Sequence, residues 1–166
     1  RLYLRVPFDK AIEGQDLVVV NPPSVMHANY SLLLYEHEGM PSPRALRALA
    51  PGFRRVTVRR IDERTLEIEP SEGFLKFFLD RLFRNEKNTL KLGQEVQVAR
   101  MTAKVLSLTE DGRPAKVAFR FETALEDGSL RWLRFHKGNF VPWKPPAAGE
   151  EEVLRPEWLT FKSVFG

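Results

Sequence analysis

The stretch that decides the fold is residues 95–143, which read EVQVARMTAKVLSLTEDGRPAKVAFRFETALEDGSLRWLRFHKGNFVPW. Apolar and polar residues alternate along it in five runs, a period typical of strands with one buried face. Three turn signals separate the last four runs, and the Asp-Gly pairs among them supply the positive φ that tight hairpins require; they are Glu110-Asp111-Gly112, Glu126-Asp127-Gly128 and Lys137-Gly138-Asn139. We therefore predict an antiparallel meander with strands over residues 95–99, 102–108, 115–122, 130–136 and 139–143.

The chain before this meander also favours strands. Residues 1–6 alternate, and Asp16–Val20 is a short apolar run ended by Asn21-Pro22-Pro23. Phe53–Arg60 and Thr65–Glu69 alternate on either side of a polar turn, which predicts a hairpin.

Helical signals occur in two places. Ser42 and Pro43 are typical N-cap and first-turn residues, so a short helix is expected over Arg44–Ala50. Large apolar side chains between Phe74 and Phe83 recur at helical spacing. The sequence as a whole therefore predicts a mainly β fold, an antiparallel β-sandwich or a strongly bent sheet, with one or two short helices.

Length and composition indicate a globular chain. With 166 residues, 43% hydrophobic and 29% charged, it can bury a core without disulfides or metals. We expect one β-rich domain over residues 1–146 and an acidic, then apolar, tail over residues 147–166. The chain starts with an alternating run rather than with Met, which leads us to expect a longer protein upstream.

Several kinds of chemistry lack the residues they need. The absence of Cys excludes disulfides and thiolate metal sites, and no Gly-x-Ser-x-Gly elbow is present. The three His residues lack the spacing of a ligand set. We therefore predict no catalytic, cofactor-binding or metal-binding residue and no cofactor, and the chain is not expected to be an enzyme.

The motif at Asn21-Pro22-Pro23 is the one feature that suggests catalysis. Asp16–Val20 followed by Asn21-Pro22-Pro23 resembles the motif with which amino-group methyltransferases hold a target amine beside S-adenosylmethionine. Position 24 is Ser rather than an aromatic residue, and no Gly-x-Gly pattern exists for the cofactor. The alternative is a core strand ended by a Pro-Pro turn, which we favour.

Three surfaces are candidates for contact with a partner. Arg54, Arg55, Arg59 and Arg60 could form a patch for phosphate or anionic lipid, or could be the solvated face of strands. Nucleic acid is not expected, because only Phe53 accompanies these charges. Trp132, Arg134 and Trp143 could line a sugar- or peptide-binding face, or could be core and edge packing.

The third surface is an aromatic stripe, represented by Phe74, Phe77, Phe78 and Leu82. Basic residues flank it, as they do in helices that lie on an anionic membrane surface; they are Lys76, Arg81, Arg84 and Lys87. The alternative is a helix or irregular segment packed on the sheet.

A larger pattern gives a family resemblance. It comprises Val105–Pro114, Val117–Phe121, Leu125–Asp127 and Leu130–Trp132, together with Arg64-Thr65-Leu66 and Glu72–Leu75. These segments resemble the C-terminal soluble region of uncharacterised multi-spanning bacterial membrane proteins, over roughly residues 15–150. The resemblance implies a periplasmic domain tethered to upstream membrane helices of the same polypeptide, or bound to an envelope partner. It transfers no catalytic residue.

Three functions follow as hypotheses. The first is a non-catalytic accessory or interaction domain of a bacterial membrane protein, which contacts the bilayer, a partner or the envelope. The second is a sugar- or peptide-binding β module, and the third is a methyltransferase fragment, which the departures above disfavour.

Overall fold

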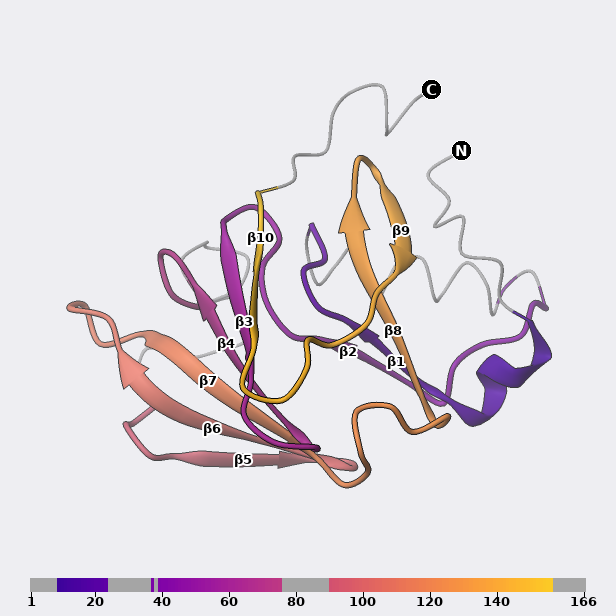
Figure 1. Cartoon of the computed structure of the whole chain (residues 1–166), viewed down its shortest axis with the longest axis horizontal. Coiled ribbons are helices and arrows are strands. Elements are labelled where there is room, and N and C mark those ends of the chain that lie inside the picture. The colour runs from indigo at the N-terminus through magenta and orange to yellow at the C-terminus, as the bar shows by residue number, and fades with distance from the viewer. Residues whose placement is uncertain (1–8, 24–36, 38, 76–89, 157–166) are drawn as a thin grey trace. The chain divides into compact units, whose positions relative to one another are not determined.

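The computed structural model describes residues 9–23, 37, 39–75 and 90–156 (Figure 1). The strand expected over residues 1–6, and Phe77, Phe78 and Leu82 of the aromatic stripe, lie outside the described residues. The chain divides into two compact units. Unit 1 comprises Arg1–Phe53, Glu126–Pro145 and Arg155–Gly166, and unit 2 comprises Arg54–Leu125 and Pro146–Leu154.

Unit 1 contains a mixed four-stranded sheet, sheet A. Its order is β2 (Ala45–Ala48), β1 (Asp16–Val19), β8 (Leu130–His136) and β9 (Asn139–Pro142). β1 is parallel to both of its neighbours, whereas β8 and β9 form an antiparallel hairpin. A short 3-10 helix, η1 (Lys10–Gly14), precedes β1.

The core of unit 1 forms where η1 meets sheet A. The buried residues of this cluster come from η1, β1, β8 and β9, and half-buried Leu46 of β2 packs against them; they are Ile12, Leu17, Val19, Leu133, Phe135 and Phe140. The rings of Phe135 and Phe140 meet edge to face with centroids 5.2 Å apart. All four residues of β1 are buried, as the apolar run predicts for a central strand.

The helix predicted over Arg44–Ala50 is wrong, because residues 45–48 form β2. Its N–H groups continue a ladder with β1 instead of closing helical turns: the N–H of Arg44 donates to the carbonyl of Gln15 at 2.8 Å, and that of Leu49 to Val19 at 3.0 Å. Ala, Leu and Arg have high helix propensity, but pairing with a buried strand outweighs a few tenths of a kcal/mol per residue.

Unit 2 contains an antiparallel six-stranded sheet, sheet B, whose strands lie side by side in Figure 1. Its order is β10 (Glu151–Leu154), β3 (Val56–Arg60), β4 (Thr65–Pro70), β7 (Pro114–Phe121), β6 (Met101–Leu108) and β5 (Glu95–Val98). The hairpin predicted over residues 53–69 is confirmed as β3 and β4. Part of the stretch treated above as a C-terminal tail is strand β10, which pairs with β3.

The two faces of sheet B differ in polarity because successive side chains of a strand point to opposite faces. One face is apolar and buried, and includes Val58, Ile68, Val117, Phe119 and Phe121. The other, called here the polar face, carries charged side chains from neighbouring strands, among them Arg59, Glu67, Glu69, Lys116, Arg120 and Glu151.

The predicted meander is interrupted after β7. β5, β6 and β7 follow one another in sheet B, but β8 pairs with β1 and β9 in sheet A. The turn at Glu126-Asp127-Gly128 therefore does not close a hairpin, and Gly128 does not adopt a positive φ. By contrast, Gly112 (φ 79°) and Gly138 (φ 80°) do, as hairpin turns require. The mainly β class is thus confirmed, with one mixed and one antiparallel sheet.

Candidate functional site

The candidate site lies in unit 2, where the chain leaves β4. We call residues Ser71–Leu75 the β4-exit segment; they follow Pro70 and contain Phe74, the first residue of the aromatic stripe. The N–H of Phe74 donates to the carbonyl of Pro114, the first residue of β7, at 2.7 Å. This bond joins the segment to the turn between β6 and β7.

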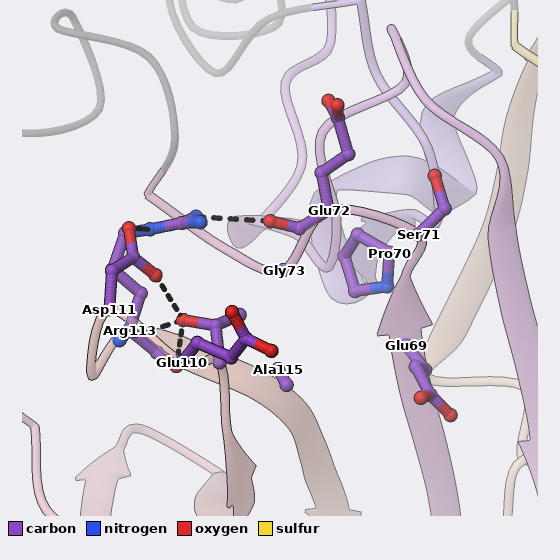
Figure 2. Close-up of a pocket in the computed structure, with 10 residues that line it drawn as sticks. Glu69, Pro70, Ser71, Glu72, Gly73, Glu110, Asp111, Arg113 and Ala115 are labelled. Carbon is purple, nitrogen blue, oxygen red and sulfur yellow. Dashed lines mark hydrogen bonds and ion pairs between the residues drawn. The ribbon is translucent and has the colours of Figure 1, made fainter.

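Arg113 makes further bonds between the turn and the segment. Its guanidinium donates to the carbonyl of Glu72 at 3.1 Å and to the carbonyl of Phe74 at 2.8 Å. Its Nε donates to the carboxylate of Asp111 at 2.7 Å. Figure 2 shows the guanidinium between Asp111 and the backbone of Glu72. One planar cation thus binds two carbonyls and a carboxylate, a geometry that the guanidinium fork permits.

The turn that carries Arg113 is itself held by hydrogen bonds. The hydroxyl of Thr109 donates to Asp111 and also accepts the N–H of Arg113 at 3.0 Å. Hydrogen bonds from Arg113 and then from Thr109 lower the pKa of Asp111 from its usual value near 3.8 to about 2. Asp111 is therefore ionised at any physiological pH and continues to orient Arg113.

An open pocket of about 410 Å³ lies beside these residues (Figure 2). It is lined by the end of β4, the β4-exit segment and the β6–β7 turn, including Glu69, Glu72, Glu110 and Asp111. Three of these four carboxylates are paired with cations: Glu69 with Lys116 at 3.1 Å, Glu72 with Arg54, and Asp111 with Arg113. The pocket is therefore acidic in composition but largely neutralised by its own neighbours.

The structure does not gather the four arginines proposed as an anion patch. Arg54 pairs with Glu72, Arg55 is exposed, and Arg59 lies on the polar face with Glu151 at 4.0 Å. Arg60 points to the opposite face of β3, is only 8% exposed, and donates to the carbonyls of Asp62 and Pro146.

The polar face as a whole balances its charges. Lys104 pairs with Glu95 at 3.2 Å, and Arg59 lies directly opposite Glu67 in the register of β3 and β4. Cross-strand pairs of this kind stabilise a sheet modestly and leave little net field.

The proposed tryptophan face is mostly buried. Trp132 in β8 and Trp143 after β9 are each 8% exposed, and their rings meet edge to face with centroids 5.6 Å apart. Arg134 of β8 is half-buried. The structure thus brings the two Trp side chains together, as mutual packing rather than as an open aromatic surface.

The Asn-Pro-Pro motif has a structural role. The side-chain amide of Asn21, 2% exposed, accepts the N–H of Phe135 at 2.9 Å and donates to the carbonyl of the same residue at 3.2 Å. The amide therefore continues the β1–β8 ladder by one further pair. The backbone of Gly52 packs tightly against the motif. A Cβ at this position would lie 2.3 Å from the backbone oxygen of Asn21, so a larger residue would not fit without a shift.

The described residues do not form a metal site with histidine ligands. His37 is exposed and His136 is half-buried, while His27 lies outside the described residues. Across residues 9–23, 37, 39–75 and 90–156, no three His, Asp or Glu side chains form a group that could hold a metal ion. Within the same residues, no helix is long and apolar enough to cross a bilayer.

Comparison of the chain with protein-family models, with curated proteins and with solved structures found no match.

Sequence reasoning missed Arg113 as a site residue. The partners that define its role, Glu72 and Phe74, lie 41 and 39 residues away along the chain. The available signal was local: Thr109, Asp111 and Gly112 form a turn that places an Arg at its last position, next to Pro114.

Proposed function

We propose that this chain is a non-catalytic interaction domain of a bacterial membrane protein, and that it contacts an anionic membrane surface through the aromatic stripe that begins at Phe74. The observation that carries the proposal is the attachment of Phe74: both of its backbone polar groups are bonded to the β6–β7 turn, the N–H to Pro114 and the carbonyl to Arg113. Sheet B therefore provides a fixed starting point for the stripe.

The other two candidate surfaces receive less support. Arg59 and Arg60 lie on opposite faces of β3, and Arg54 and Arg59 are paired with carboxylates. The tryptophans that could stack on a sugar are buried against each other. The aromatic stripe remains the candidate whose composition, apolar with flanking Lys and Arg, suits a lipid headgroup region.

The proposed location rests on the family resemblance over roughly residues 15–150. We infer that the domain lies on the extracytoplasmic side of a bacterial membrane, tethered by upstream membrane helices of the same polypeptide or held by an envelope partner. A tether would raise the effective concentration of the stripe at the bilayer, so a weak contact would suffice.

Flotation with lipid vesicles tests the proposal. The chain should float with vesicles that contain phosphatidylglycerol and should float less at high salt, because the basic flanks are screened. The double variant Phe77→Ser, Phe78→Ser should reduce the bound fraction by at least about tenfold, since burial of an aromatic side chain contributes about 1.5–3 kcal/mol.

Leu92→Ser is the matched control. Leu92 is a large apolar residue of unit 2, 64% exposed and outside the stripe. Its substitution should leave flotation unchanged. A native chain that fails to float, or a double variant that floats like the native chain, would contradict the proposed function.

A further inference from the structure

Strand β5 is an outer strand of sheet B. Among the strands that the structure describes, it pairs with β6 alone. Three of its four residues are exposed, and Val96 is half-buried. Val98 is 38% exposed, and Leu92, shortly before the strand, is 64% exposed. An edge strand presents a row of backbone N–H and C=O groups to which another strand can add, so β5 is a candidate interaction surface.

Turns on either side limit this edge to four residues. Before β5, the N–H of Gly93 donates to the carbonyl of Val105 at 2.8 Å, and the N–H of Val105 donates to the carbonyl of Gln94 at 3.0 Å. Two residues thus oppose one residue of β6, as in a β-bulge, and Gly93 has the positive φ of 77° that such a bulge uses. After β5, the register passes from Val98 directly to Met101.

The alternation of an antiparallel ladder determines which backbone groups of β5 point outward. Because the carbonyl of Gln94 bonds to β6, the next residues whose backbone groups face β6 are Val96 and Val98. The N–H and C=O groups of Glu95 and Gln97 consequently point away from β6. Within the described parts of the chain, no strand pairs with β5 on that side.

The other edge strands of the two described sheets carry residues that disfavour such pairing. Residues 150–152 at the start of β10 are all Glu, β9 ends at Pro142, and β2 contains Arg47. Charges and Pro at a sheet edge oppose the addition of a further strand. β5 contains one charge, Glu95, and Lys104 of β6 pairs with it at 3.2 Å. Among the described edges, β5 is therefore the least protected.

A second copy of β5 is complementary to this edge. If two β5 strands run antiparallel with Val96 opposite its own counterpart, the outward groups of Glu95 meet those of Gln97, and four backbone hydrogen bonds form around a twofold axis. On the polar face, each Glu95 carboxylate then lies beside a Gln97 carboxamide, which is a hydrogen-bond donor. A shift of the register by two residues leaves two bonds and places Glu95 opposite Glu95 or Gln97 opposite Gln97.

We propose that β5 is a homodimerisation edge, through which two copies of this chain join their B sheets into one continuous sheet. The edge is short, so the dimer is weak and reversible, with a Kd on the order of 0.1–1 mM. The inference goes beyond the proposed membrane contact and is independent of it, because no residue of the aromatic stripe takes part.

Sedimentation velocity of the whole chain, from about 10 µM to about 1 mM, tests the proposal. Gln97→Pro removes an outward N–H and blocks the approach of a second strand, while the ladder with β6 is kept, as is usual for Pro on an edge strand. Gln97→Glu and Gln97→Lys form a matched pair. The first places a carboxylate opposite Glu95 of the second copy, and the second places an ammonium there.

The native chain should pass from monomer to dimer over this range, and Gln97→Pro should remain monomeric. The Kd should rise about fivefold in Gln97→Glu and fall about fivefold in Gln97→Lys, because the cross-strand pair occurs twice in the symmetric dimer. Hydrogen exchange is the second readout. The amides of Glu95 and Gln97 should gain protection as the concentration rises, whereas the Val96 amide, which faces β6, should not change.

A native chain that stays monomeric up to about 1 mM would overturn the proposal. So would association that Gln97→Pro leaves intact, because another surface would then be in contact. Protection of the Gln97 amide that does not depend on concentration would show that the edge is occupied within one chain, and would overturn the dimer as well. If Gln97→Pro fails to fold, the Glu and Lys variants decide, and equal Kd values for the two would overturn the proposal.

Discussion

Replacement of Asn21 by Ala should destabilise unit 1 strongly. The Asn21 amide makes two hydrogen bonds to the backbone of Phe135, at 2.9 and 3.2 Å, and both residues are 2% exposed. Alanine leaves a buried N–H and a buried carbonyl without these partners, each at a cost of about 1–3 kcal/mol. Partial access of water to the vacated space offsets some of this, so we expect a loss of about 3 kcal/mol.

Urea unfolding and thermal melting measure this loss. For a chain of this size about 3 kcal/mol corresponds to a fall of about 6–12 °C in Tm. Hydrogen exchange should be faster at the Phe135 amide in particular. The matched control is Asn139→Ala in the β8–β9 turn, where an exposed Asn donates to the carbonyl of Lys137 at 3.2 Å; its cost should stay below about 0.5 kcal/mol.

A second variant separates the donor from the acceptor. Asn21→Asp keeps an acceptor for the N–H of Phe135 but places a carboxylate against its carbonyl. Burial would raise the pKa of the introduced carboxyl, so its protonation on acidification restores a donor. The stability difference between Asn21→Asp and the native chain should therefore shrink between pH 7 and pH 4.5.

If Asn21→Ala lies within about 0.5 kcal/mol of the native chain and exchange at Phe135 is unchanged, the amide does not continue the ladder. A fully stable Asn21→Ala variant that loses binding of S-adenosylmethionine present in the native chain would instead favour the methyltransferase hypothesis.

Three further predictions concern single positions. Gly73→Ala should cost more than Gly93→Ala in urea unfolding: both have a positive φ, which costs about 1 kcal/mol or more, but only Gly73 has atoms within 3 Å of a new Cβ; equal costs would contradict the close fit at Gly73. Trp132→Ala should cost about 3–5 kcal/mol, because the side chain is buried, and a loss below 1 kcal/mol would indicate an exposed ligand face instead. The lowered pKa of Asp111 means that its ion pair stabilises the fold fully above about pH 4 and is lost as the pH falls through about 2; Asp111→Asn should therefore flatten the acid limb of a stability–pH curve, and an unchanged limb would refute this.

Most strands could be predicted from the sequence because alternation survives in any sheet with one buried face. Val56 and Val58, or Val117 and Phe119, are buried at every second position, as the pattern indicates. Alternation does not determine which strand a given strand pairs with. β8 has the same alternation whether it pairs with β7 or with β1, and its pairing with β1 joins residues more than 100 positions apart.

The helix error has a related cause. Ala45–Ala48 has no strong β propensity, and the sequence around Ser42 and Pro43 is a good helix start. Only the buried β1 beside it makes the extended conformation favourable. Arg113 was missed for a similar reason: its local sequence indicates a turn, and its role depends on carbonyls 41 and 39 residues away along the chain.

The pairing of β1 with β8 has a consequence for synthesis of the chain. β1 ends at Val19 and β8 begins at Leu130, so the 110 residues between them must leave the ribosome before sheet A can close. β3 likewise waits for Glu151 before its second neighbour in sheet B exists. Late, non-local pairings slow folding and expose unfinished strand edges in the meantime. We expect the β6–β7 hairpin, with Arg113 in its turn, to form early and the two strands β1 and β10 to join last.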